Sequence, residues 1–439
     1  MRIIYSGLLV ALFLAFAQTT YATTSLEVLA QKAISKRASE SAPAIAKLRS
    51  LGPAGLEALI RSHATEIDRY TNEPLTPPTA NWLRLSSAID SVSQQRDSYL
   101  SGLYWYTDLA QARADARATG KPILSLRLLG RLSEEYSCAN SRFFRAILYS
   151  NAEVSALLRE RFVLHWQSVR PAPRVTIDFG DGRKLERTLT GNSIHYIIDS
   201  EGRVIDALPG LYGPVAFLRA LNDARDTFVK LHGLNVSART QVLDDYHRSS
   251  IRRITSDWLA DVRSVGGKVP AHLIRQSPTP ESRRAIEAAP LAVTKMVAEV
   301  SILRAITRDA EALGAVTDDE AWTSIARLRI EDARLDNRSL GLIQRQLREI
   351  PAMNAAKGIN LSKLIETLQL SVALDTVRND YMLRTKLHSW LTVDPARNNL
   401  EAFNEKVYRE LFLTPRSDPW LGLFSPETYV ALENGGLSR

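Results

Sequence analysis

The sequence predicts an α+β protein in which a central α/β domain lies between two helical regions. Apolar residues recur at helical spacing up to about residue 100, helix and strand patterns alternate from there to about residue 232, and no strand-like run follows. The composition, 45% hydrophobic and 24% charged over 439 residues, is that of a globular protein with two or three domains. We therefore expect a signal peptide (1–22), an N-terminal helical segment (23–100), a central domain (101–232) and a C-terminal helical domain (233–439).

The first residues have the pattern of a secretory signal. Arg2 precedes a mostly apolar run from Ile3 to Phe16, and small residues allow cleavage after Ala17 or Ala22. The run is shorter than the ~20 apolar residues of a membrane-spanning helix, so an uncleaved anchor is the weaker alternative. We expect an exported protein, periplasmic or secreted, with no stable membrane anchor once the signal is removed.

The N-terminal segment is expected to be helical. Gly52-Pro53 interrupts one helix, and Leu56 and Leu59 resume helical spacing after the break. Residues 72–79, NEPLTPPT, are expected to form a proline-rich loop.

The central domain is predicted to open with a helix followed by two strands. Asp108 is suited to cap a helix that Gly120 ends. Residues 122–130 and 161–169 are apolar runs of strand length, with helical spacing at residues 143–158 between them. This order predicts a βαβ unit.

Two hairpins and a helix are expected to complete the central domain. Gly180-Asp181-Gly182 separates VTIDF from KLERTL, and Ser200-Glu201-Gly202 separates SIHYIID from RVIDAL. Glycine and aspartate tolerate the positive backbone angles of tight turns. Residues 213–231 have the spacing of an amphipathic helix, so we expect helices that cover a mixed sheet.

The C-terminal domain is expected to be all helical. Residues 291–306 have the pattern of a buried helix, and residues 360–390 that of a longer one. The run from Thr317 to Glu320 is predicted to be a capping box. Trp420 lies in an aromatic, proline-bearing segment that we expect to dock onto these helices, with a partner surface as the alternative.

Cys138 is the only cysteine in the chain, so no intramolecular disulfide can form and packing alone must hold the fold. It opens the tetrapeptide CANS, which follows the first strand-like run and precedes the helical spacing at residues 143–158. A cysteine at a helix N-terminus lies near the positive end of the peptide dipoles, which favours the thiolate.

The order of motifs around this turn resembles the thioredoxin-like superfamily, in particular its exported or highly divergent members. The matching parts, in that superfamily's order and spacing, are Trp105, Ala112 to Ala116, Gly120-Lys121-Pro122, Cys138-Ala139-Asn140-Ser141, Val154, Leu157-Leu158 and Phe162-Val163. The resemblance is confined to the central domain. It implies a thioredoxin-like fold for residues 101–232.

The resemblance implies roles for four residues and departs from the superfamily at two of them. Cys138 corresponds to the attacking sulfur, and Ser141 replaces the second cysteine. Ser193 stands where the superfamily has a cis-proline facing the sulfur, which makes Asn192 and Ser193 candidate substrate-binding residues. Loss of the proline weakens peptide capture, and a simple turn after Gly191 is the alternative.

Two functions from different classes follow from the thiol turn. In the first, monothiol disulfide exchange or thiol redox, Cys138 attacks a disulfide of a protein or small molecule, and the Ser141 hydroxyl stabilises the thiolate. Serine cannot attack the mixed disulfide, so an external thiol must resolve each turnover. In the second, a redox-inactive thioredoxin-like domain serves as a non-enzymatic interaction or scaffold protein, and the cysteine is retained for packing.

Other chemistry finds little support in the sequence. The seven histidines lack metal-ligand spacing, and His165 and His195 are expected to be lone strand residues, so we expect neither a metal nor a cofactor. The string Asp178-Phe179-Gly180 lacks the companion motifs of a kinase. Residues 244–247, DDYH, are expected to form a solvated helix face. The net charge of +8 comes without a base-reading motif, so we expect an arginine-rich surface and no binding of nucleic acid.

Overall fold

The computed structural model of the protein describes residues 25–73, 78–189, 191–267, 317–348, 350, 360–421 and 431. The expected signal peptide and the expected helix at residues 291–306 lie outside them. Within the described residues the protein is a mixed α+β structure, and helices cover both sides of a mixed five-stranded sheet. The coarse fold class predicted from the sequence is therefore confirmed.

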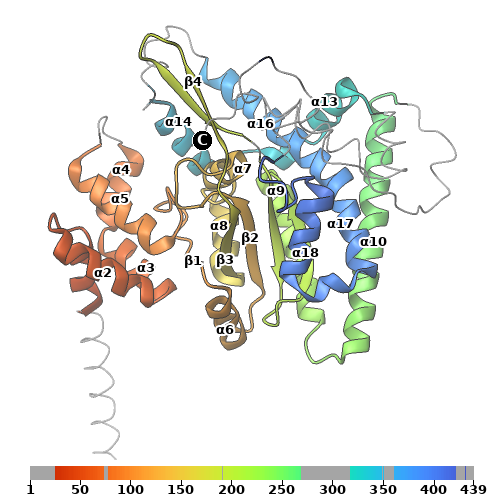
Figure 1. Ribbon diagram of the computed structural model, residues 1–439, viewed down its shortest axis with the longest axis horizontal. Helices are drawn as coiled ribbons and strands as arrows, with labels where there is room; N and C mark the ends of the chain where they lie inside the picture. Colours follow the sequence, from red (N-terminus) through yellow and green to blue (C-terminus); the bar gives the residue numbers. More distant parts are fainter. Residues whose placement is uncertain are drawn as a thin grey trace, which may run out of the picture.

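Short helices at the N-terminal end of the described chain pack beside the sheet (Figure 1). Residues 25–33 are helical, and four further helices follow: α2 (Ala38–Ser50), α3 (Pro53–Ser62), α4 (Ala64–Asn72) and α5 (Ala80–Ser93). The predicted break is confirmed, since Gly52 has a φ of 68° between α2 and α3. A Cβ atom on Gly55 would lie 2.0 Å from the carbonyl oxygen of Leu48, so these two helices can approach only through a glycine.

The central sheet has five strands in the order β1-β3-β2-β6-β7. Their bounds are β1 (Trp105–Tyr106), β2 (Ile123–Leu129), β3 (Val163–Arg170), β6 (Ser193–Ile198) and β7 (Val204–Pro209). Strands β1, β3 and β2 are parallel, whereas β6 is antiparallel to both β2 and β7. Every residue of β2, β6 and β7 is buried, because helices lie on both faces of these strands.

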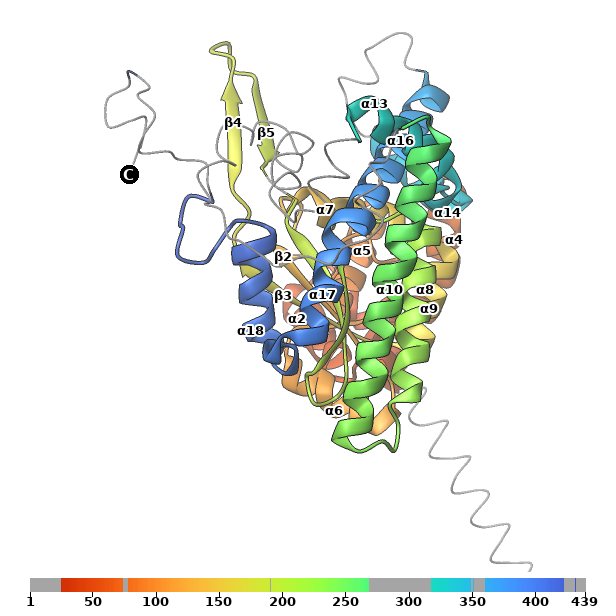
Figure 2. The same ribbon diagram turned by 90° about the vertical axis from the view of Figure 1, so that its right-hand side faces the viewer.

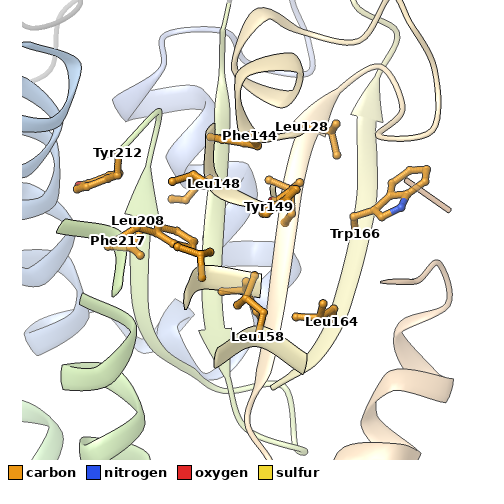
Figure 3. Packing of buried hydrophobic residues seen from close by; sticks show 14 of the residues in the cluster. Leu128, Phe144, Leu148, Tyr149, Leu158, Leu164, Trp166, Leu208, Tyr212 and Phe217 are labelled. Carbon is orange, nitrogen blue, oxygen red and sulfur yellow. The ribbon is translucent and has the colours of Figure 1, made fainter. Parts of the chain in front are cut away.

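Helices from the same part of the chain pack on the sheet. They are α6 (Leu109–Thr119), α7 (Ala139–Phe143), the π-helical turn η1 (Phe144–Leu148), α8 (Ala152–Arg161) and α9 (Pro214–Lys230). As predicted, Asp108 caps α6 and Gly120, at a φ of 67°, ends it. Figure 3 shows the side chains of Phe144, Leu148 and Tyr149 close together beside the strands, with Phe217 next to Leu208.

A two-stranded hairpin projects from this body (Figure 2). Strands β4 (Arg174–Asp178) and β5 (Lys184–Thr188) pair only with each other, around a turn that contains Gly180 and Gly182 at positive φ. The predicted hairpin is therefore confirmed. It is an insertion between β3 and β6, and it leaves Ile177 and Phe179 exposed.

The described residues after α9 form helices and turns. The helices are α10 (Val236–Ser264), α13 (Asp319–Leu328), η4 (Ile330–Ala333), α14 (Asn337–Arg348), α16 (Leu361–Arg378), η5 (Asn379–Arg384), α17 (Thr385–Val393), η6 (Pro395–Asn398), α18 (Leu400–Lys406) and η7 (Val407–Leu411). The long helix predicted at residues 360–390 is present, with a π-helical turn inside it. The predicted capping box is wrong by one residue, because Asp318 and not Thr317 accepts the hydrogen bond that caps α13.

These C-terminal helices pack directly on the sheet. On the central strand, the buried Arg127 donates a hydrogen bond of 2.6 Å from Nη2 to Oε1 of Glu401 in α18. At the far edge, the backbone N–H of Gly213 donates to the hydroxyl of Thr376 in α16 at 2.7 Å. Among the described helices, none is both long and apolar enough to cross a membrane.

Candidate functional site

The predicted thiol site lies at the end of β2, and its helix does not begin immediately after the strand. Residues 130–137 leave the sheet and fold back, so that the backbone N–H of Cys138 donates to the carbonyl oxygen of Leu129 at 3.0 Å. Gly130 opens this loop at a φ of 76°, a conformation that favours glycine. Cys138 is the N-cap residue of α7, as the resemblance implies.

Ser141 lies in the first turn of the same helix, but its hydroxyl is engaged with the backbone. The Ser141 Oγ donates to the carbonyl oxygen of Cys138 at 2.9 Å. Both side chains have a relative exposure of 0%. The hydroxyl that was predicted to stabilise a thiolate therefore donates its hydrogen bond to a backbone carbonyl group instead.

The structure brings Asn192 and Ser193 into the same region. Ser193 begins β6 and pairs in register with Leu128 on β2, next to the strand end that holds the backbone of Cys138. In addition, the side-chain amide of Asn140, from the first turn of α7, donates to the carbonyl oxygen of Gly191. The four residues selected from the sequence thus lie around one turn, and all four are buried.

The chain's own C-terminal segment covers the Asn192 side of this turn. The Tyr408 hydroxyl donates to the carbonyl oxygen of Asn192 at 3.2 Å, and the Asn192 side-chain amide donates to the hydroxyl of Thr414 at 3.1 Å. Arg170 on β3 fixes the segment by donating to the carbonyl oxygens of Thr414 and Asp418, at 3.0 and 2.7 Å. Residues 408–418 therefore cover Asn192, one of the two candidate substrate-binding residues.

The segment ends near Trp420, whose docking was predicted. The Trp420 side chain is 47% exposed, whereas Leu421 is 8% exposed and belongs to the core cluster. The segment is therefore held through Thr414, Asp418 and Leu421, while the Trp420 side chain stays about half exposed. Leucine, with no ring N–H to satisfy, is the residue that enters the apolar contact.

The two tyrosine hydroxyls that interact with Cys138, those of Tyr149 and Tyr408, are neutral at physiological pH. Burial raises the pKa of Tyr149 and of Tyr408, and proximity to Cys138 adds to the effect at both hydroxyls. The Tyr149 hydroxyl is 2.7 Å from Nε2 of His195. Burial lowers the pKa of this histidine to about 3. A neutral imidazole and two neutral phenols do not supply the positive charge that usually activates a cysteine.

The histidines predicted to be scattered are partly brought together by the fold. His247 on α10 and His388 on α17 face each other with their Nδ1 atoms 2.9 Å apart, and both are fully buried. Nδ1 of His388 also lies 3.9 Å from Oδ1 of Asp206 on β7. The prediction of a solvated face at residues 244–247 is therefore wrong for the last two residues.

Tyr246 belongs to the same cluster, since its hydroxyl donates to Oδ2 of Asp206 at 2.6 Å. Arg384 donates to the same oxygen at 2.8 Å. Burial raises the pKa of Asp206, but Arg384 and His388 outweigh burial and hold the pKa below its ordinary value. The cluster is thus a buried ion pair with hydrogen-bonded neighbours, and it joins the sheet to three helical elements.

In the residues that the structure describes, no three His, Cys, Asp or Glu side chains are grouped so that they could hold a metal ion. The chain matches no family model, no curated protein and no solved structure.

Proposed function

We propose that this protein is an exported interaction or scaffold protein built on a thioredoxin-like domain whose thiol performs no redox chemistry. The observation that carries the proposal is that the turn at residues 138–141 is buried and covered by another part of the same chain. Cys138 has no exposed surface, and the chain's own residues 408–418 hydrogen-bond to the neighbouring Asn192.

The arrangement of elements supports a thioredoxin-like domain. A βαβ unit with parallel strands is followed, after the projecting hairpin, by an antiparallel strand pair and the closing helix α9. The cysteine lies at the N-cap of the helix that follows the central strand. These are the features that the resemblance predicted for residues 101–232.

The covering segment supports a binding role over catalysis. A peptide substrate is held by hydrogen bonds to free backbone groups beside the sulfur. Here the carbonyl oxygen of Asn192 already accepts from Tyr408, and Gly191 already accepts from Asn140. An external disulfide would have to displace these internal contacts before it reached Sγ of Cys138.

Monothiol disulfide exchange is the second candidate, and the N-cap position of Cys138 is what favours it. In that reaction the thiolate attacks one sulfur of a disulfide, a new S–S bond forms, and the other sulfur leaves as a thiolate. An external thiol then attacks the mixed disulfide and returns Cys138 to its reduced form. This chemistry requires residues 408–418 to move away from the turn.

Thiol labelling distinguishes the two functions. The native protein and the protein in guanidinium chloride are treated with a small aromatic disulfide across pH 6 to 9. The proposal predicts that native Cys138 reacts at least ~100-fold more slowly than in the unfolded chain, because reaction needs local opening. Rapid native labelling, with an apparent thiol pKa well below ~8.5, would instead establish the exchange function.

The matched control is a Cys138→Ala, Ser249→Cys double variant, in which the thiol sits at an exposed position of α10. It should react at the same rate with and without denaturant. Equal protection of this exposed thiol would show that the reagent, and not burial, limits the rate.

A further inference from the structure

A cleft with a volume of about 570 Å³ is lined by none of Cys138, Ser141, Asn192 and Ser193. Its walls come from the N-terminal helices α4 and α5, from residues 94–99 and 131–134, and from α14. Segments from the N-terminal and C-terminal parts of the chain thus line one cavity. The helices α4 and α14 lie near each other in Figures 1 and 2. The volume is within the range of small-ligand sites.

The lining of this cleft is mainly polar. Four serines and two glutamines are among the lining residues: Ser86, Ser87, Ser91, Ser133, Gln94 and Gln346. The aromatic rings of Trp82 and Tyr99 are at most 8% exposed, so they form the wall and offer little apolar surface to an occupant. A polar ligand suits such a lining better than a hydrocarbon.

Most charged groups at the cleft have partners within the protein. Arg131 pairs with Glu134 at 3.5 Å, and Arg96 pairs with Glu135 at 2.7 Å. The Asp90 carboxylate accepts three hydrogen bonds, from the backbone N–H groups of residues 97 and 98 and from the hydroxyl of Ser98. Burial raises the pKa of Asp90 to about 6, and the nearby Asp97 adds to this effect.

Arg345 on α14 is different. Its side chain is 7% exposed, and its guanidinium donates only to neutral acceptors, the carbonyl oxygen of Thr71 at 3.1 Å and the hydroxyl of Tyr99 at 3.2 Å. The Nε atom is buried and has no hydrogen-bond partner, and within the described part of the chain no carboxylate lies at ion-pair distance. A buried cation without a counterion is costly, so this position is strongly suited to an anion.

A second buried guanidinium lies behind the same wall. Arg145 is 4% exposed and donates to the carbonyl oxygen of Glu134, a lining residue, at 3.0 Å, while its Nε also lacks a partner. Burial lowers the pKa of Arg145, as expected for a cation held away from water. Two buried guanidinium groups therefore lie at the cleft or behind its wall, where they offset the lining carboxylates Asp90, Asp97 and Glu134.

We propose that the cleft binds a small polar ligand through an oxyanion group, a carboxylate or a phosphate, held by the guanidinium of Arg345. A guanidinium presents N–H donors in a plane that fits the two oxygens of either group. The serine hydroxyls and glutamine amides of the lining then hydrogen-bond the uncharged part of the ligand. None of these residues belongs to the thiol turn, so this site does not depend on the proposed function.

Calorimetric titration of the full-length protein with inorganic phosphate and, separately, with succinate tests the site. Saturable binding of at least one probe is expected, and the probe that binds identifies the oxyanion. Arg345→Gln should weaken that binding about 10- to 100-fold, the usual cost of losing charge-assisted hydrogen bonds. Arg348→Gln, at an exposed position of the same helix, should change it less than about twofold.

Two outcomes would overturn the proposal. One is the absence of saturable binding for both probes. The other is binding that Arg345→Gln leaves unchanged, which would mean that Arg345 serves only to hold the C-terminal end of α4. If Arg345→Gln does not fold, the variant Ser133→Trp tests the site instead. The new indole ring fills the cleft from a loop and leaves the Arg345 guanidinium in place. It should abolish binding without lowering the melting temperature of the protein.

Discussion

Asp206 on β7 and Arg384 at the end of η5 form a buried ion pair, with Oδ2 and Nη2 2.8 Å apart. Their side chains are 1% and 3% exposed. They lie 178 positions apart in the sequence, so the pair fastens the C-terminal helices to the sheet.

Asp206→Asn should destabilise the protein by about 3–5 kcal/mol, because it leaves the buried Arg384 without its main counterion. The double variant Asp206→Leu, Arg384→Met should cost less than Asp206→Asn, since it removes both buried charges. Urea denaturation followed by circular dichroism measures both free energies of unfolding. A cost below about 1 kcal/mol for Asp206→Asn would contradict the assigned role of the pair.

Stability should fall as the pH is lowered from 7 to 5. Burial lowers the pKa of His247 to about 4 in the folded protein, with Arg397 and Arg384 adding to burial and Asp206 and Asp244 opposing it. In the unfolded chain the pKa is about 6.5, so between these values only the unfolded state takes up the proton. The resulting loss from this one group is about 2 kcal/mol between pH 7 and pH 5.

Urea denaturation at both pH values checks this loss. His247→Gln should reduce the difference between the two pH values, whereas His232→Gln, at an exposed position, should leave it unchanged. Equal pH dependence in the wild type and in His247→Gln would show that other groups cause the loss.

Gly213→Ala should destabilise the protein by about 1–3 kcal/mol through overpacking. The φ of Gly213 is −69°, which alanine adopts without strain, but a Cβ atom would lie 2.1 Å from the carbonyl oxygen of Asp332 and 2.6 Å from Cα of Ala333. The variant must therefore separate α9 from η4. Val215→Ala, at an exposed site two residues on, should remain within about 0.5 kcal/mol of the wild type. Thermal denaturation of the two variants provides the comparison.

Arg170→Gln should increase the native labelling rate of Cys138. It removes the two hydrogen bonds that hold the carbonyl oxygens of Thr414 and Asp418, and so favours local opening of residues 408–418. A loss of about 1.4 kcal/mol in the opening free energy corresponds to a tenfold faster rate. Arg187→Gln, on the projecting hairpin, is the control and should leave the rate unchanged. No change in Arg170→Gln would show that this segment does not limit access to the sulfur.

The sheet could be predicted because its signals are local. Residues 122–130 form one apolar run, and in the structure β2 is buried along its whole length. Gly182 and Gly202, which marked the two hairpin turns, have φ angles of 91° and 84°, a backbone conformation that strongly favours glycine. The position of Cys138 at the N-cap of a helix after the central strand was likewise predictable from the order of the motifs.

The buried network was missed because a buried stripe of α10 is itself polar. Its buried positions include His247, Ser250 and Asp261 as well as Ile254 and Trp258, so apolar periodicity does not reveal which face is covered. A histidine on such a stripe is indistinguishable from a surface residue until its partner is known. Here the partner, His388, lies 141 positions away.

Two further features were not predicted, for a related reason: the segment that covers the thiol turn, and the cleft lined by Arg345. Tyr408 reaches Asn192 across 216 positions, and Arg345 reaches Thr71 across 274. Sequence spacing carries no information about contacts at this separation. The shift of the cap from Thr317 to Asp318 has another origin, because adjacent threonine and aspartate are both good N-cap residues.

The contact between Arg127 and Glu401 bears on the order in which the molecule can be completed. A ribosome makes the central strand long before the carboxylate 274 positions downstream, so the Arg127 guanidinium must stay hydrated until α18 has been made. A prematurely terminated chain would keep an unmatched cation at the middle of its sheet. The interior of the sheet can therefore close around this guanidinium only after residue 401 has been made.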